Sequence, residues 1–447
     1  MTLPQNISAV LDRLTSSGFE AYIVGGCVRD MLMGREPSDF DITTSASPEQ
    51  TLAVFGDMHT LTHGMKHGTV TVMADGEPVE ITTFRKDGEY KDSRHPETVS
   101  FDATLEQDLA RRDFTCNAMA YDPAEGLVDI FGGQEDIKNG VIRAVGDPEE
   151  RFNEDALRIL RALRFASVLG FEIEEKTAQA AKKCSPLLAN VSGERIYAEL
   201  SKLLCGKNCF NIIMDHPEVL DRVVPGILRM KGYSQHNSYH IYTLLEHTAR
   251  VVMNVPAKPY MRLAALLHDI GKPDCQTVDK DDPEKWHFHG HPERSVEMAE
   301  EIIHKLKCDG ETRDRALGII KYHDVRFKAD EKMILRWLGK LGEEMFLDIL
   351  DLHYADITAQ NPLYFDERAE NLAGIRAIIA DAVAKQRCFT VSSLAINGKD
   401  IIALGIPQGQ CVGALLDALL EEVIDGKLEN ERNNLLERAK ELADLQQ

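Results

Sequence analysis

Two aspartates one residue apart, Asp39 and Asp41, carry the most informative chemistry in the sequence. In an extended strand, side chains alternate between two faces, so both carboxylates point the same way while Phe40 and Ile42 point into a core. Magnesium is a hard cation that proteins usually hold through one or two carboxylates together with substrate phosphates. We therefore predict a strand from Phe40 to Thr43 that carries a magnesium site.

A glycine pair and an arginine, Gly25, Gly26 and Arg29, come shortly before these aspartates. The pair opens a predicted short helix over residues 28–33, where free backbone N–H groups bind phosphate, and a guanidinium suits phosphate as well. Taken alone, each piece would be explained by a turn or by an exposed strand edge. The order of glycines, arginine and aspartates favours a nucleoside triphosphate site.

Glu80 is the candidate for a third catalytic carboxylate. It lies on the second strand of a predicted hairpin, in which residues 69–74 and 78–84 are joined by Asp75-Gly76, a strong turn signal. Apolar residues bracket Glu80 on both sides. A surface glutamate on a strand edge is the alternative interpretation.

Arg111, Arg112 and Asp113 form the next charged group, directly before an apolar run over residues 114–121. Such a group can simply cap the following helix. In a chain that already shows a triphosphate site, contact with the phosphates or the ribose of a nucleotide is the favoured interpretation.

Asp155 and Arg158 are spaced three residues apart within a predicted helix over residues 153–169, which would place them side by side. An ordinary helical ion pair is one interpretation, worth about 0.3–0.5 kcal/mol. The other interpretation follows from the hydrogen-bonding groups on the pairing edges of the bases. Cytosine and adenine both present an amino donor beside a ring-nitrogen acceptor, so an aspartate and an arginine together would select C and A and reject U and G without a template.

The elements that must position these residues change along the chain. The first part alternates helices, beginning with one over residues 7–15, and strands, beginning with one over residues 21–24, which indicates a small α+β domain. After Gly140 strand signals fade and helices dominate. We predict four domains: a head over residues 1–140, a helical neck over 141–230, a helical body over 231–385 and a helical tail over 386–447.

Composition restricts the class of protein. At 447 residues the chain is too long for one core, and no stretch approaches the roughly 20 apolar residues of a membrane span. The N-terminus has no signal-peptide pattern, so we expect a cytoplasmic protein with no membrane partner.

Nine cysteines without a Cys-x-x-Cys pair fit reduced thiols. A net charge of −22 argues against broad nucleic-acid coating, so any nucleic acid must be gripped locally.

The motifs resemble those of a known family. In order they are Gly25-Gly26-x-Val28-Arg29-Asp30, Asp39-Phe40-Asp41, Arg111-Arg112-Asp113, Glu154-Asp155-x-x-Arg158 and Ser192-Gly193-Glu194-Arg195-Ile196. Together they look like the ordered motifs of the class II tRNA nucleotidyltransferases, which comprise bacterial CCA-adding enzymes and poly(A) polymerases.

This resemblance implies a polymerase-β-like head followed by neck, body and tail units that hold the tRNA acceptor arm. It also implies addition or repair of the 3′-terminal CCA of tRNA from CTP and ATP, with Asp39 and Asp41 on magnesium. An A-adding partial enzyme and a poly(A) polymerase are the nearest alternatives. The residues implied to line the nucleotide pocket are Gly26, Arg29, Arg112, Asp155, Arg158, Arg161 and Arg164.

The segment over residues 87–101 resembles the loop of family members that add the terminal A, whereas enzymes that add only the two Cs are reported to lack it. His95 departs from the pattern, because many relatives have a second arginine there. A polar hairpin loop is the alternative. We favour complete CCA addition.

A second group of candidate ligands lies in the helical body. Neither histidine nor aspartate is buried cheaply without a partner. The candidates in this stretch are six histidines, His247, His268, His287, His289, His291 and His323, and two aspartates, Asp269 and Asp356. Mixed nitrogen and oxygen ligands suit a transition metal or magnesium. The stretch over residues 236–360 resembles the HD-domain phosphohydrolases, which implies His247, His268, Asp269 and Asp356 as metal ligands and His291 and His323 as ligands of a second metal, with Mn, Ni, Co or Mg as the ion.

Two functions of different classes therefore compete. One is a nucleotidyltransferase with an accessory HD unit. The other is a metal-dependent phosphohydrolase or RNA-binding protein with a vestigial head. The head retains every charged group that nucleotidyl transfer requires, which favours the first. The sequence leaves the oligomeric state open.

Overall fold

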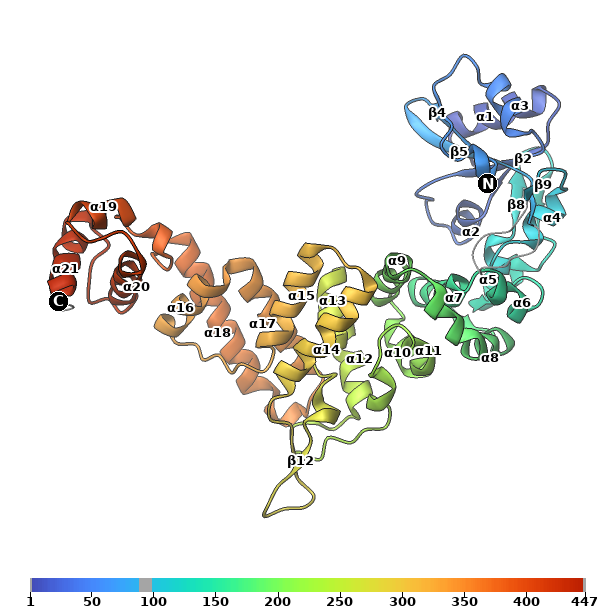
Figure 1. Cartoon of the computed structure of the whole chain (residues 1–447). Helices are drawn as coiled ribbons and strands as arrows, with labels where there is room; N and C mark the ends of the chain where they lie inside the picture. Colours follow the sequence, from blue (N-terminus) through green and yellow to red (C-terminus); the bar gives the residue numbers. More distant parts are fainter. Residues whose placement is uncertain (1, 88–98, 445–447) are drawn as a thin grey trace. The chain divides into compact units, whose positions relative to one another are not determined.

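The computed structural model describes residues 2–87 and 99–444, and it consists of two compact units (Figure 1). The first unit comprises residues 1–229 and 302–308, and the second comprises residues 230–301 and 309–447. Among the described residues, no helix is long and apolar enough to cross a membrane. The four-domain division stays a prediction.

A seven-stranded mixed sheet forms the first part of the first unit, in the order β3-β4-β5-β2-β1-β8-β9. Strand β2 runs antiparallel to β1 and parallel to β5, so β2 lies in the interior of the sheet. Its neighbours fix its register and therefore which side chains reach the sheet surface. The strands are β1 (Ala21–Val24), β2 (Asp41–Thr44), β3 (Thr60–Leu61), β4 (Thr69–Ala74), β5 (Glu77–Thr83), β8 (Ala120–Asp122) and β9 (Gly126–Val128).

The predicted hairpin around Asp75-Gly76 is confirmed. Strands β4 and β5 pair in antiparallel register from Thr69↔Thr82 to Ala74↔Glu77. Both turn residues have positive φ, 53° at Asp75 and 86° at Gly76, which is the backbone that a two-residue hairpin turn matching the twist of the strands requires.

The core of this sheet forms because its strands and helix α1 (Gln5–Ser16) bury apolar residues at the proper periods. Ile7, Leu11 and Leu14 are spaced at three- and four-residue intervals and face the sheet. Ile42 and Ile81 are 0% and 1% exposed on neighbouring strands. Further helices of this part are α2 (Gly26–Leu32), α3 (Pro48–Val54), α4 (Leu105–Ala110) and α5 (Gly133–Asn139).

The helix predicted over residues 153–169 is wrong as a single element. The structure has α6 (Pro148–Glu154) and α7 (Leu157–Leu169) with a break between them. Asp155 has extended backbone, φ −139° and ψ 105°, and its carboxylate accepts a hydrogen bond from the Leu157 N–H at 3.1 Å. An aspartate that bonds the backbone two residues on competes with the helix, which explains the break.

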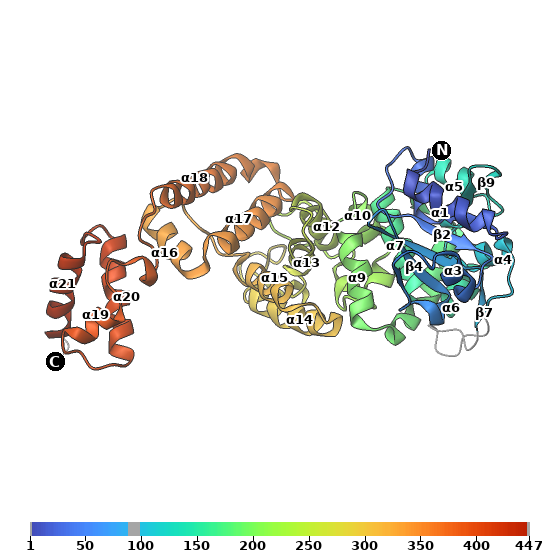
Figure 2. The ribbon, with the colours of Figure 1, turned by 90° about the horizontal axis from the view of Figure 1, so that it is seen from above.

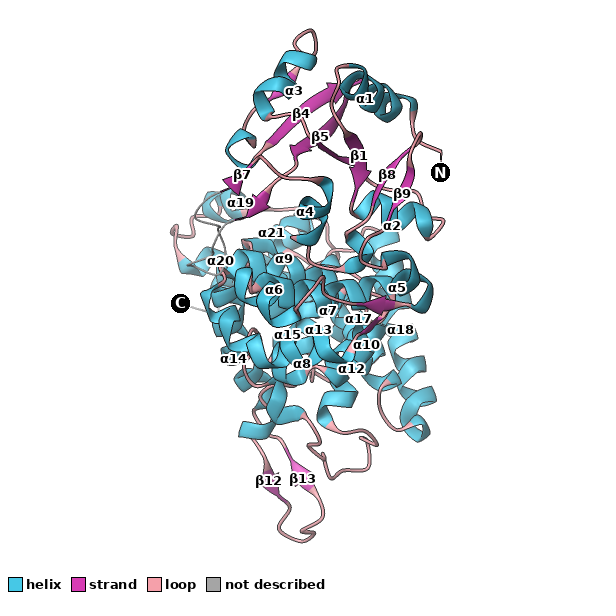
Figure 3. Cartoon of the chain, turned by 90° about the vertical axis from the view of Figure 1, so that its right-hand side faces the viewer, coloured by secondary structure: helices cyan, strands magenta, loops and turns pink. Residues whose placement is uncertain are grey.

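The rest of the first unit and nearly all of the second are helical, whereas Figure 3 shows most strands in the sheet described above. Helices α17 and α18 run side by side in the second unit (Figure 2). The predicted α+β head followed by helical domains is confirmed. The main helices are α8 (Glu175–Cys184), α9 (Gly193–Leu204), α10 (Cys209–Asp215), α12 (Leu244–Asn254), α13 (Pro259–Leu267), α14 (His291–Leu306), α15 (Gly310–Tyr322), α16 (Glu331–Leu341), α17 (Glu343–Thr358), α18 (Phe365–Ala384), α19 (Gly398–Ala403), α20 (Gln410–Ile424) and α21 (Arg432–Asp444).

Candidate active site and metal centre

Three carboxylates gather where β2 begins. Asp41 and Glu80 are register partners on parallel strands, and the charges of both Asp39 and Glu80 act on Asp41. Strand β2 begins at Asp41, one residue later than the predicted Phe40, and Asp39 precedes it while its charge acts on Asp41. Burial by surrounding protein and the two neighbouring carboxylates raise the pKa of Asp41 to about 6, against the opposing charge of Arg112.

This carboxylate group fits magnesium. Its donors are hard carboxylate oxygens, and desolvation together with repulsion from Asp39 and Glu80 raises the pKa of Asp41. A divalent cation would relieve that repulsion. Residues Asp39, Asp41 and Glu80 are therefore the set that would hold the ion.

Gly25, Arg29 and Arg112 come together beside these carboxylates. Gly25 precedes α2 with φ +85°, and a Cβ there would lie 3.1 Å from Nη1 of Arg112, so the glycine leaves room for that guanidinium. Arg29 is only 8% exposed, and its Nη1 donates to Oδ1 of Asn117 at 2.8 Å. Two buried guanidiniums in fixed positions are suited to a polyphosphate.

Asp108 holds the side chains of Arg111 and Arg112 in position. It was not predicted as a site residue. Its carboxylate is fully buried and accepts from Nη2 of Arg111 at 2.7 Å and from Nη2 of Arg112 at 3.4 Å. Burial alone would raise the pKa of Asp108, but the two guanidiniums outweigh it and lower that pKa. The signal was in the sequence, because Asp108 precedes the arginines by three and four residues on one helical turn.

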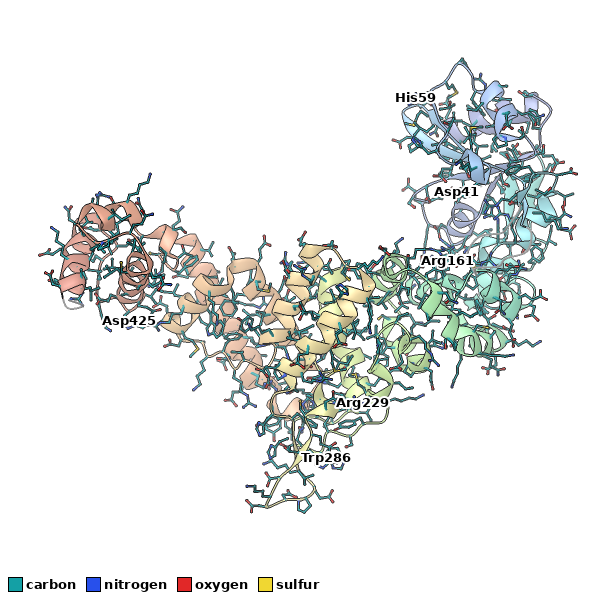
Figure 4. The ribbon with its side chains drawn as sticks, in the orientation of Figure 1. Asp41, His59, Arg161, Arg229, Trp286 and Asp425 are labelled. Atoms are coloured by element: carbon teal, nitrogen blue, oxygen red, sulfur yellow. The ribbon has the colours of Figure 1, made fainter. Side chains whose placement is uncertain are left out.

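Asp113 forms an ion pair with Arg161 on α7. Nε of Arg161 donates to Oδ2 of Asp113 at 2.7 Å, and Asp113 is 9% exposed. Burial would raise the pKa of Asp113, yet the Arg161 charge and hydrogen bond lower it. Figure 4 shows Asp41 on the sheet and Arg161 on α7 within the same unit. The predicted head and neck residues are thus brought together by this ion pair.

The predicted side-by-side pair of Asp155 and Arg158 is not observed, because Asp155 lies outside α7. Oδ2 of Asp155 instead accepts from Nη2 of Arg195 at 2.9 Å. Nη1 of Arg158 contacts Oε2 of Glu154 at 2.5 Å, and its Nη2 donates to the Arg111 carbonyl at 2.9 Å. Both predicted base-reading residues are therefore held by separate partners.

Arg164 is held by Glu199, which was also not predicted. Nε of Arg164 donates to Oε2 of Glu199 at 2.8 Å, and the Arg164 guanidinium carbon lies 3.5 Å from the ring centroid of Phe165. Glu199 is 8% exposed on α9. Its partner lies 35 residues away in the chain, so no local pattern predicts this contact.

Four of the six candidate histidines converge on Asp269. Their ring Nδ1 atoms each lie within 3.0 Å of a backbone carbonyl oxygen, a position that favours a proton on Nδ1 and makes Nε2 available as a metal ligand. Those Nε2 atoms face carboxylate oxygens at 3.1–3.5 Å from Asp269, as expected of metal ligands. The four are His247, His268, His291 and His323.

Asp356 joins this histidine–aspartate cluster, with Oδ1 at 3.1 Å from Nε2 of His247. Within the described residues, Nε2 of His247 and of His268 are buried without a hydrogen-bond partner. Buried imidazole nitrogens without such partners, beside the carboxylates of Asp269 and Asp356, fit one or two divalent metal ions. The candidate groups are His247, His268 and Asp269, and Asp269, His291 and His323.

Charges around the cluster keep its aspartates ionised. Burial would raise the pKa values of Asp269 and Asp356, but neighbouring histidines, and for Asp269 also Lys272, hold both well below the usual range. Nζ of Lys272 lies 2.7 Å from Oδ2 of Asp269. The cluster lines a cavity of about 1230 Å³, which Tyr239, Trp286, Arg326, Tyr364 and Arg368 also line.

His287 and His289 do not join the cluster. Nε2 of His287 lies 2.7 Å from Oδ2 of Asp279, on the hairpin of β12 (Thr277–Val278) and β13 (Trp286–His287). The His289 ring stacks on His287 with centroids 5.4 Å apart. Trp286 marks this hairpin in Figure 4.

The loop predicted to govern terminal A addition lies mostly outside the described residues, which omit 88–98. Its flanking strands, β6 (Lys86–Asp87) and β7 (Val99–Ser100), pair in antiparallel register.

Comparisons with known proteins agree with this arrangement. Residues 21–143 match the model of the poly A polymerase head domain, residues 170–229 match that of the probable RNA and SrmB-binding site of polymerase A, and residues 288–439 match that of a putative tRNA nucleotidyltransferase domain 2. The CCA-adding enzyme of Geobacillus stearothermophilus is 34% identical over 433 residues, which cover 96% of this chain and 95% of that protein. The chain belongs to the CCA-adding enzymes.

Other CCA-adding enzymes support the assignment. That of Enterococcus faecalis is 34% identical over 96% of this chain and 94% of its own length. The crystal structure of the Bacillus stearothermophilus CCA-adding enzyme in complex with CTP has a TM-score of 0.72 and 31% identity, and covers 100% of this chain and 99% of that one. The predicted family and the predicted activity, a CCA tRNA nucleotidyltransferase, are confirmed.

Proposed function

We propose that Asp39, Asp41 and Glu80 form the transfer centre of this CCA-adding enzyme. The observation that carries the proposal is the register pairing of Asp41 with Glu80, together with the raised pKa of Asp41. There the 3′-hydroxyl of tRNA attacks the α-phosphate of CTP or ATP, the new phosphodiester forms, and pyrophosphate leaves. Magnesium, when bound, would neutralise charge on the triphosphate and lower the pKa of the attacking hydroxyl.

Arg29 and Arg112 hold the triphosphate in this proposal. Phosphoryl-type transfer requires positioning and charge neutralisation more than covalent help. Asn117 and Asp108 fix the two guanidiniums before substrate arrives, so little side-chain entropy is lost when phosphate binds. Arg111 and Asp113 act by holding Asp108 and Arg161 rather than by touching phosphate.

Asp155 and Arg158 choose the base. A carboxylate accepts a hydrogen bond from the amino group that cytosine and adenine share, and a guanidinium donates to the adjacent ring nitrogen. Uracil and guanine offer a carbonyl and an N–H at these positions and are rejected. Arg161 and Arg164 line the same neck surface, and the tRNA acceptor arm supplies the hydroxyl. A tRNA substrate is consistent with the cytoplasmic location expected from the sequence.

The transfer centre is tested with Asp41→Asn and Glu80→Gln on a tRNA that ends at the discriminator base, which reports C addition, and on one that ends in CC, which reports A addition. We expect Asp41→Asn to abolish addition of both C and A while tRNA binding stays within about twofold, and Glu80→Gln to lower kcat by at least about tenfold. Glu77→Gln on the same strand is the matched control, because Glu77 is also exposed. Turnover by Asp41→Asn near the wild-type rate would refute the assignment.

We also propose that the histidine–aspartate cluster is a metal-dependent phosphohydrolase centre. The unpartnered Nε2 atoms of His247 and His268 beside two ionised aspartates support it. Bound metal would supply an activated water for attack on a phosphomonoester or a 2′,3′-cyclic phosphodiester at a damaged tRNA end. The basic side chains that line the cavity, among them Arg326 and Arg368, suit a phosphate.

Hydrolysis of both substrate types is measured with manganese, nickel, cobalt and magnesium. We expect His268→Ala to abolish it and His304→Ala, an exposed residue of α14 outside the cluster, to leave it unchanged. An Asp41→Asn protein should hydrolyse normally, which separates this activity from the transfer centre. A wild-type protein inert toward both substrates with all four metals would refute the proposal.

A further inference from the structure

Arg195, in the one family-like motif without an assigned role, contacts a residue that we have assigned to base choice. Its Nη2 donates to Oδ2 of Asp155 at 2.9 Å across 40 residues of sequence. We propose that Arg195 is a positioning residue that sets the base selectivity of this enzyme by fixing the plane of the Asp155 carboxylate. This inference rests on the proposed role of Asp155.

The backbone around Asp155 does not hold its side chain by itself. Asp155 ends α6 with extended dihedral angles and lies two residues before α7 begins, so it has no neighbour one helical turn away on a common helix. Its fixation comes from two hydrogen bonds, one from the Leu157 N–H to Oδ1 at 3.1 Å and one from Arg195 to Oδ2 at 2.9 Å. The Arg195 bond is the only one of the two that a substitution can remove.

Two bound oxygens fix the orientation of a carboxylate. Each carboxylate oxygen has two lone-pair sites, so Asp155 keeps one site per oxygen for a base after both contacts are made. A fixed plane presents those sites to an amino group in one geometry. The side chains of Asp155 and Arg195 are 20% and 29% exposed, which leaves the carboxylate reachable while the ion pair is partly protected from water.

Helix α9 holds Arg195 in a fixed position. Glu199 follows Arg195 by four residues, so both lie on one face of α9, and Glu199 binds Arg164 from that face. Leu200 and Leu203 on α9 are 0% exposed, which anchors the helix in the core of the unit, and α9 packs against α7. One rigid helix therefore orients both Asp155 and Arg164, two residues that we propose to line the nucleotide pocket.

Loss of this support should affect selectivity more than catalysis. Specificity is a difference of affinities, and a carboxylate free to rotate can accept from the ring N–H of uracil or guanine as well as from an amino group. A purely structural role predicts a different outcome, in which addition of every nucleotide falls by the same factor. The two roles are therefore separated by the ratio of correct to incorrect incorporation.

The test is competition among all four nucleoside triphosphates on a tRNA ending at the discriminator base and on one ending in CC. We expect Arg195→Met to reduce the preference for CTP over UTP, and for ATP over GTP, by about tenfold or more, the scale of one good base contact. Arg195→Lys, which keeps the charge, should recover part of the preference. Lys202→Met removes an exposed charge from the same helix and should change neither ratio.

Combination with Asp155→Ala completes the design. If Arg195 acts through Asp155, adding Arg195→Met to Asp155→Ala causes no further loss of selectivity, so the two effects are not additive. Equal losses with all four nucleotides and unchanged ratios, in both Arg195→Met and Arg195→Lys, would overturn the inference. An Asp155→Ala protein with wild-type ratios would instead overturn the proposed role of Asp155 itself.

Discussion

At the scale of single residues, the raised pKa of Asp41 links magnesium binding to pH. Below about 6 this carboxyl is protonated, so protons compete with the cation and apparent magnesium affinity falls. The pH dependence of the free energy of unfolding has the opposite sign to that of a salt-bridged aspartate, whose pKa is lowered on folding. The folded state binds more protons than the unfolded state between the ordinary value of 3.8 and about 6, so desolvation and ionic repulsion of the charged form cost stability above that window, and protonation relieves both.

We therefore expect magnesium to raise the melting temperature more at about pH 8 than at about pH 5. Asp41→Asn should remove the part of this increase that depends on the head, and the measurement is thermal unfolding of both proteins with and without magnesium chloride. Equal magnesium-induced shifts in wild type and Asp41→Asn at both pH values would contradict the assignment.

Asp108 yields a second prediction at this scale. Asp108→Asn leaves Arg111 and Arg112 near each other without their buried counter-charge, and loss of one partner of a buried ion pair costs about 3–5 kcal/mol. We expect a lower free energy of unfolding in urea and a higher KM for CTP and for ATP alike. Asp102→Asn, an exposed aspartate before the same helix, is the control and should change neither value.

Side chains that we propose to bind a phosphate or a metal could be predicted because their types and spacing match the chemistry. Asp39, Asp41 and Arg29 are of this kind. Asn117 and Glu199 could not be predicted, because their partners lie 88 and 35 residues away and only the folded chain brings them together. The supporting residues of a site are set by tertiary structure.

At the scale of elements, the close approach of α7 to the segment after α9 keeps the neck arginines in place. At Gly206 a Cβ would lie 2.2 Å from Oγ of Ser167 on α7, and Oγ of Ser167 donates to the Leu203 carbonyl at 2.6 Å. Only a residue without a side chain fits there.

Gly206→Ala should therefore separate α7 from α9 and lower the free energy of unfolding by about 1–3 kcal/mol, as overpacking does. Urea unfolding measures this, and CCA addition should weaken in parallel. Gly413→Ala is the control, since no atom lies within 4 Å of a Cβ at that helical position and alanine is the better helix former. Equal stability of Gly206→Ala and wild type would contradict the packing account.

The hairpin of β4 and β5 could be predicted at this scale because its turn residues are strong local signals. The break between α6 and α7 was missed, since no glycine or proline marks it. Asp155 was the available signal, because aspartate favours capping positions over helix interiors.

At the scale of the whole molecule, the two proposed chemistries lie in separate compact units. The transfer centre belongs to residues 1–229, and every member of the histidine–aspartate cluster belongs to the second unit. Substitutions at sites that share no partners usually have additive effects. We expect Asp269→Asn to abolish phosphohydrolysis and to leave kcat/KM for CCA addition within about twofold, measured on one protein preparation. A parallel loss of CCA addition would show that the sites are coupled.

The order of the motifs predicted the family at this scale, since five motifs in sequence constrain a chain far more than any one of them. Domain boundaries were harder to predict. Residues 302–308, at the end of α14, belong to the first unit although they follow much of the second in the chain, and no local composition marks such a return.

The most direct test of the central claim uses wild-type protein and three tRNAs, ending at the discriminator base, at C and at CC, with CTP and ATP alone and together. The account predicts that each tRNA is extended to CCA and no further, that CTP alone adds only the missing Cs, and that ATP alone extends only the CC end. Extension of the CC end alone, or addition of a run of A residues, would contradict it.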